Sequence, residues 1–87
     1  MLMVVNMEKE EVEELVDMTI NRWFNLSEKF INELEGTKLG DIIRKLKEFR
    51  REYDLDLYDI EAITKLCFGE QEGDFILAVY LKSIEKP

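Results

Sequence analysis

The stretch LYDIEAITKLCFGEQEGDFILAVYLKSI, residues 57–84, decides the fold class because it fits two different periodicities. Every second residue from Tyr58 to Phe68, and again from Phe75 to Leu81, belongs to a mostly apolar series. The segment GEQEG between them has the glycines of a turn. This alternation, together with the β-branched and aromatic content, predicts a β-hairpin with strands at about 57–68 and 74–84.

The same stretch also fits a helical interpretation. Five residues share one face at helical spacing, namely Leu57, Ile60, Ile63, Thr64 and Cys67. If that face is the buried one, residues 57–84 form two helices. The alternative to a sheet is therefore an all-α bundle of four helices.

The first 53 residues predict one short strand followed by two helices. Met1–Val5 is a short apolar run with β-branched residues, typical of a strand. An apolar stripe at helical spacing follows, comprising Val12, Leu15, Val16, Thr19, Ile20 and Trp23. The helix carrying this stripe either breaks near residues 25–27 or continues to Gly36. A second helix near 38–53 has its own apolar stripe, comprising Leu39, Ile42, Ile43, Leu46, Phe49 and Tyr53.

Together these elements predict a single small α+β domain spanning residues 1–87. The two helices are expected to form an αα-hairpin, because their connection is short. They would pack on one face of a small sheet that contains the C-terminal hairpin and the N-terminal strand. A chain of 87 residues is long enough for one modest core.

Charge is strongly negative but unevenly distributed. The net charge is −8, and residues 36–53 carry 6 basic and 3 acidic groups while the rest of the chain is acidic. An acidic chain is a poor sequence-independent binder of nucleic acid, because phosphate neutralisation supplies most of that affinity. The single cysteine, Cys67, is typical of a reducing, cytoplasmic compartment. No apolar run approaches the roughly 20 residues of a membrane-spanning helix.

The residue types that commonly perform catalysis are missing or isolated. The chain has no histidine, which is the usual general base near neutral pH. Cys67 falls within an apolar pattern that indicates a small core residue rather than a nucleophile. We therefore predict no catalytic residue, no metal site and no cofactor.

Two features of the first helix suggest a protein interface. Trp23 belongs to the apolar stripe, whereas Phe24 lies about 100° away around the helix, so one core cannot easily bury both. An exposed Phe24 would suit an interface anchor. The alternative is that a second layer or a helix break covers Phe24. The opposite face carries an acidic ridge, comprising Glu10, Glu13, Glu14 and Asp17. We therefore expect a non-enzymatic intracellular protein that binds or regulates another protein, or pairs with itself as a homodimer.

The basic helix supports an alternative function. Arg44, Lys47 and Arg51 form one ridge opposite the second apolar stripe, and they are candidates for a phosphate or an acidic partner. A nucleic-acid-associated regulator would use this ridge. Conversely, the acidic surface elsewhere could imitate a phosphate backbone and inhibit a nucleic-acid-binding protein. The competing interpretation is a solvated helix face, because Asp41 and Glu48 each lie four residues from a basic residue and can pair with its charge on the helix surface.

Overall fold

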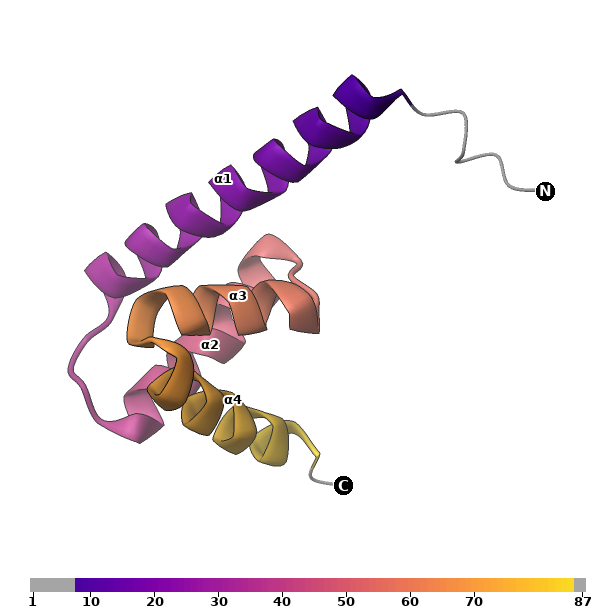
Figure 1. Ribbon diagram of the computed structural model, residues 1–87. Helices are drawn as coiled ribbons and strands as arrows, with labels where there is room; N and C mark the ends of the chain where they lie inside the picture. Colours follow the sequence, from indigo (N-terminus) through magenta and orange to yellow (C-terminus); the bar gives the residue numbers. More distant parts are fainter. Residues whose placement is uncertain (1–7, 86–87) are drawn as a thin grey trace.

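The computed structural model describes residues 8–85, and in this range the protein is all-helical (Figure 1). The helices are α1 (Lys9–Glu33), α2 (Leu39–Tyr53), α3 (Leu57–Phe68) and α4 (Glu70–Ile84). The α+β prediction is therefore wrong, and the alternative of four helices is the architecture of the described chain. The strand predicted at Met1–Val5 lies outside the described residues.

The β-hairpin predicted at residues 57–68 and 74–84 is replaced by α3 and α4. A local signal starts α3: the Asp56 side chain accepts a hydrogen bond from the backbone N–H of Asp59, and the Asp59 carboxylate accepts one from the N–H of Asp56. This reciprocal capping box satisfies two backbone donors that a helix start leaves free. The apolar residues then follow helical spacing, because Ile60, Ile63 and Thr64 are all fully buried.

The two glycines that suggested a hairpin turn have different roles. Gly69 alone joins α3 to α4, with a φ of 90° that other residues rarely adopt. Gly73 lies inside α4, where a Cβ atom would stand 2.9 Å from the Cα of Lys65. Gly73 therefore permits close packing of α4 on α3 instead of closing a turn.

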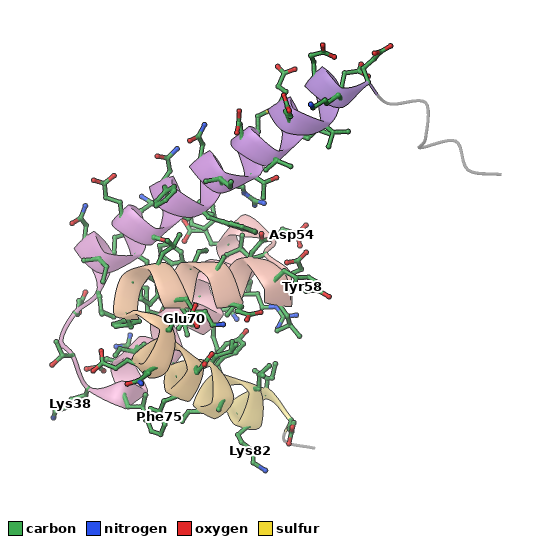
Figure 2. The ribbon with its side chains drawn as sticks, in the orientation of Figure 1. Lys38, Asp54, Tyr58, Glu70, Phe75 and Lys82 are labelled. Carbon is green, nitrogen blue, oxygen red and sulfur yellow. The ribbon has the colours of Figure 1, made fainter. Side chains whose placement is uncertain are left out.

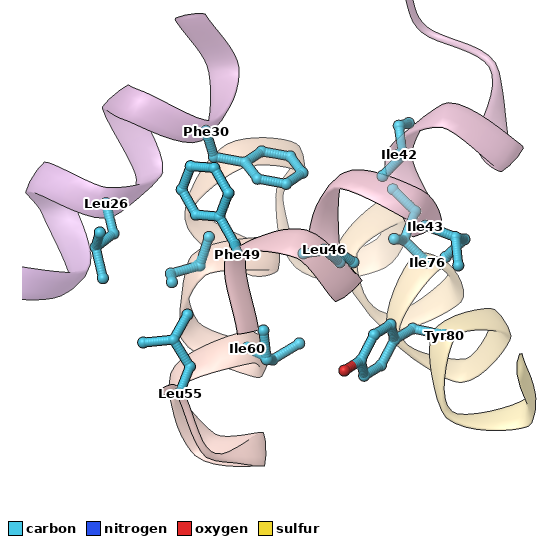
Figure 3. Packing of buried hydrophobic residues seen from close by; sticks show 11 residues of the cluster. Leu26, Phe30, Ile42, Ile43, Leu46, Phe49, Leu55, Ile60, Ile76 and Tyr80 are labelled. Atoms are coloured by element: carbon cyan, nitrogen blue, oxygen red, sulfur yellow. The ribbon is translucent and has the colours of Figure 1, made fainter. Parts of the chain in front are cut away.

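Aromatic and branched side chains from all four helices, with Leu55 of the α2–α3 connection, form one core (Figure 3). The ring of Phe30 in α1 meets the edge of the Phe49 ring in α2, with centroids 5.3 Å apart. On the other side of the core, buried Tyr80 of α4 accepts a hydrogen bond from Arg50 Nη1 at 3.2 Å. The predicted buried stripe of the second helix is confirmed for Ile42, Ile43, Leu46 and Phe49.

The first helix does not break near residues 25–27, because α1 runs without interruption for 25 residues. It packs chiefly on α3, while α2 packs on α4, so the expected αα-hairpin of the first two helices is not the main packing unit. Only Leu26, Ser27 and Phe30 of α1 are buried. Figure 1 shows the N-terminal half of α1 extending well past the other three helices.

Candidate protein-interaction surface

The N-terminal half of α1 carries an apolar face that no other described element covers. We call residues 9–20 the overhang, and we call its apolar face the stripe, comprising Val12, Leu15, Val16, Thr19 and Ile20. Val12 is 44% exposed, Leu15 48% and Val16 50%. The stripe lies on the same side of α1 as the core residues Leu26 and Phe30, because all of them follow one helical period. One continuous apolar face is thus buried at its C-terminal end and open at its N-terminal end.

The lengths of the helices explain why the stripe is uncovered. α1 has 25 residues, whereas its main neighbour α3 has 12. At about 1.5 Å of rise per residue, α1 is longer than α3 by roughly 20 Å, so half of α1 has nothing to pack against.

A polar clasp marks the point where α1 meets the rest of the protein. Trp23 Nε1 donates a hydrogen bond of 2.7 Å to Asp59 Oδ1, and Arg22 Nη1 lies 3.8 Å from Asp59 Oδ2. Arg22 also donates to the carbonyl oxygen of Tyr53 at 3.0 Å. Burial alone would raise the pKa of Asp59, but the hydrogen bonds from Trp23 and the Asp56 backbone and the Arg22 charge together hold it below its usual value.

The structure separates the two aromatic residues that the sequence singled out. Trp23 is half-buried and tied to Asp59, so it positions α1 instead of projecting into solvent. Phe24 is 55% exposed, as an interface anchor requires. Phe24 borders two shallow hollows between α1 and α3, of about 450 and 330 Å³, and Leu66 of α3 lines both. Phe24 and Leu66 therefore extend the apolar surface onto the adjoining part of α3.

The acidic ridge lies on the outer side of the overhang, away from the stripe. Glu10, Glu13, Glu14 and Asp17 are all exposed, and none of them forms an ion pair within residues 8–85. Figure 2 shows side chains standing out from this part of α1 along its whole length. The overhang is thus an amphipathic helix segment in which the stripe carries only uncharged residues and the opposite face is acidic.

The three members of the basic ridge of α2 have different surroundings. Arg44 Nη2 lies 3.2 Å from Asp41 Oδ1, and Arg44 Nη1 lies 3.7 Å from Glu48 Oε2, so its charge is met within α2. Lys47 and Arg51 are exposed and border a hollow of about 470 Å³ next to Tyr80. The interpretation as a solvated face therefore accounts for Arg44, while Lys47 and Arg51 are left as the exposed cations of this ridge.

Sequence reasoning missed the residues that now define the surface. Val12, Leu15, Val16 and Ile20 matched a core-facing stripe, and the structure leaves them exposed. The length of the first helix could have indicated this exposure, because no other helix within residues 8–85 is long enough to cover an unbroken helix from residue 9 to 33. That signal depends on α1 being continuous, which periodicity alone left undecided.

Other kinds of site find little support in the described part of the chain. Residues 8–85 contain no group of three or more side chains suited to hold a metal ion. Burial raises the pKa of the Cys67 thiol to about 11, and its Sγ donates a hydrogen bond of 3.4 Å to the carbonyl oxygen of Ser27. None of the helices within this range has the length and apolar character needed to cross a membrane.

Comparison with known protein families, with curated proteins and with solved structures finds no match for this chain.

Proposed function

We propose that the protein is a non-enzymatic interaction module that binds an α-helix of a protein partner along the stripe of α1. The observation that carries this proposal is the continuous apolar face of α1, which leaves the core near Trp23 and stays uncovered to Val12. An amphipathic helix with an open apolar face is one half of a common recognition mode, in which a second apolar helix face completes the contact.

The chemistry of the overhang favours a protein over a lipid surface as its partner. Helices that lie on membranes usually carry lysine and arginine on their polar face, which attract anionic lipid. Here the polar face carries Glu10, Glu13, Glu14 and Asp17, which anionic lipid would repel. A protein helix with an apolar face meets the stripe without placing charge against this acidic face.

Phe24 and Leu66 give the surface a second contact region beside the stripe. Exposed aromatic residues that border a hollow are frequent anchors of protein interfaces. Phe24 projects at the junction of α1 and α3, so a helix lying on the stripe would reach it at one end. We place this function in the cytoplasm, in keeping with the single cysteine of the chain.

Site-specific photo-crosslinking in cells that produce the protein tests the proposal. A benzophenone amino acid replaces Val16 in the stripe, and in a matched variant it replaces Glu14, which lies on the opposite side of the same helix turn. We expect a protein adduct from position 16 and little from position 14. Equal yields from the two positions, or no adduct from either, would contradict binding through the stripe.

A further inference from the structure

We infer that the helix that covers the stripe is α1 of a second copy of this chain, in antiparallel orientation. The inference rests on the proposed function, because it names the partner of the same surface. Three properties of the described chain support it: the position of the other helices, the length of the overhang, and the distribution of charge along α1.

The position of the other helices excludes a parallel pair. α3 covers the C-terminal half of α1 on the side that bears the stripe, and α2 and α4 lie beyond α3 on that same side (Figure 1). In a parallel pair the two sets of helices would occupy the same space between the copies. In an antiparallel pair centred near Val16 they lie at opposite ends, and each overhang fills the uncovered length of the other.

The overhang is also the right length for this arrangement. Residues 9–20 span about 18 Å at 1.5 Å of rise per residue. With Val16 facing Val16 of the second copy, residue 9 of one chain comes level with Trp23 of the other. Trp23 is hydrogen-bonded to Asp59 of α3, so the tip of each overhang ends level with this contact in the other copy.

Charge along α1 favours the same orientation. Acidic residues are concentrated at positions 8–17, whereas positions 18–27 contain Arg22 and no acidic group. In a parallel pair the acidic segments 8–17 of the two chains would lie side by side and repel each other. In the antiparallel pair the acidic segment of each chain lies beside the segment of the other chain that contains Arg22.

One cross-pair follows from this symmetry. Glu11 and Arg22 are eleven residues apart, so they lie within about 20° of each other on one flank of the stripe. A two-fold axis brings equal flanks together, which places Glu11 of each chain within one turn of Arg22 of the other. The side chain of Arg22 is 48% exposed, and its guanidinium has N–H donors beyond the one given to the Tyr53 carbonyl. The Glu11 carboxylate accepts from the N–H of Glu8 through Oε1, which leaves Oε2 for this pair.

The size of the stripe indicates a weak dimer. With its side chains about half exposed, the stripe offers apolar surface on the order of 400 Å² per chain, within the usual range for the largest patch on a monomer. Two such faces bury roughly 800 Å² in total, which is small for a specific interface and corresponds to a weak association in the micromolar range. Monomer and dimer would then coexist at ordinary laboratory concentrations.

The first test is the solution mass of the full chain by sedimentation, from about 1 to 300 μM, a range that brackets a micromolar dissociation constant. We expect a reversible monomer–dimer equilibrium. Val16→Glu should raise the dissociation constant by at least about 30-fold, which is the effect of removing an interface hot spot. The matched variant Asn21→Glu adds the same charge about 140° away around the helix and should change it by less than about 3-fold.

The second test determines orientation by disulfide trapping in a Cys67→Ala background. In the antiparallel pair Val16→Cys should cross-link to itself, because the two-fold axis passes near this residue, whereas Glu14→Cys should not. A mixture of Val12→Cys and Ile20→Cys chains should form the mixed disulfide in preference to either symmetric one. Preferential symmetric disulfides at residue 12 would show a parallel pair and overturn the inference.

The two proposals fail in different ways. A strict monomer across the concentration range overturns the second-copy inference, as does an equal loss of dimer in Val16→Glu and Asn21→Glu. If photo-crosslinking from position 16 then gives an adduct heavier or lighter than two chains, the stripe binds a different protein and the proposed function stands. The absence of any adduct from position 16 would contradict both the proposed function and the second-copy inference.

Discussion

Replacing Gly73 by alanine should destabilise the protein, although alanine is the better helix former. In an exposed helix interior, a change from glycine to alanine usually stabilises by about 0.5–1 kcal/mol. At Gly73 the new Cβ atom would stand 2.9 Å from the backbone Cα of Lys65 and 3.0 Å from its Cγ. The Cα of Lys65 belongs to the backbone of α3 and cannot move by itself, so the added methyl group must push α4 away from α3.

The expected size of the effect follows from two opposing contributions. Overpacking by one methyl group in a close contact typically costs about 1–3 kcal/mol. The helix-propensity gain of about 0.5–1 kcal/mol offsets part of that cost. The two ranges leave a net cost of roughly 0–2.5 kcal/mol, and we expect Gly73→Ala to lower the free energy of unfolding by about 1 kcal/mol. This corresponds to a fall in Tm of several degrees for a domain of this size.

Gly40 provides a matched control within the same chain. It lies in the first turn of α2, and no atom stands within 4 Å of the position of an added Cβ. Gly40→Ala should therefore leave stability unchanged or raise it by up to about 1 kcal/mol, since alanine restricts the unfolded chain.

Urea and thermal unfolding followed by circular dichroism measure both variants, at one protein concentration because self-association would shift Tm. A stabilised Gly73→Ala would refute the close α3–α4 contact. It would instead agree with a glycine in an exposed helix interior, where nothing opposes the added methyl group.

Three further predictions concern Asp59, Cys67 and the basic ridge of α2. The lowered pKa of Asp59 means that its stabilising contribution is present above about pH 4, the pKa of an unfolded aspartate, and is lost as the pH falls through the folded value. Asp59→Asn should therefore lower the free energy of unfolding by about 1–2 kcal/mol at pH 6, and this difference between variant and wild type should shrink below pH 4. A difference in the free energy of unfolding that does not change with pH, together with unchanged Trp23 fluorescence, would contradict the contact of Asp59 with Trp23 and Arg22. The Cys67 thiol, with a pKa of about 11 against a usual 9, should react with a disulfide reagent at pH 8 about 100-fold more slowly in the folded chain than in urea, and equal rates would show that it is not shielded. Anisotropy titrations should detect no binding of a labelled DNA duplex at physiological salt, and a salt-sensitive affinity lost in Lys47→Glu/Arg51→Glu would favour the nucleic-acid alternative instead.

The second helix was predictable because its sequence is unambiguous. The buried positions Ile42, Ile43, Leu46 and Phe49 repeat at helical spacing, and the intervening residues are charged. No strand pattern fits such a sequence. The predicted bounds of about 38–53 agree with Leu39–Tyr53.

Residues 57–84 were mispredicted because their apolar residues are too numerous for periodicity to decide. In α4 nearly every residue from Phe75 to Leu81 is apolar, so alternation and helical spacing both fit. What decides between them is the Asp56–Asp59 capping box and the contact of Gly73 with Lys65. The first is a local pattern of two aspartates three residues apart, which hydrophobic periodicity does not take into account. The second depends on how two helices pack and is visible only in the structure.

The candidate site was predictable in part. The position of Phe24 around the helix indicated only that one core could not easily bury both it and Trp23, and its exposure is known from the structure. The acidic ridge followed from spacing alone. The stripe was not predictable, because a buried and an uncovered amphipathic face have the same sequence pattern. Only the difference in length between α1 and its neighbours distinguishes them.

The overhang has a consequence for the folding of α1 itself. A helical segment of about a dozen residues is marginal in water when nothing packs against it, and it persists chiefly as a continuation of a stabilised helix. In a single chain the amide protons of α1 should therefore exchange faster from Phe30 toward Lys9. When the stripe is covered, these turns gain packing, so the helical content of the protein should rise with its own concentration. Ellipticity at 222 nm would then report assembly, and α1 would complete its folding as it binds.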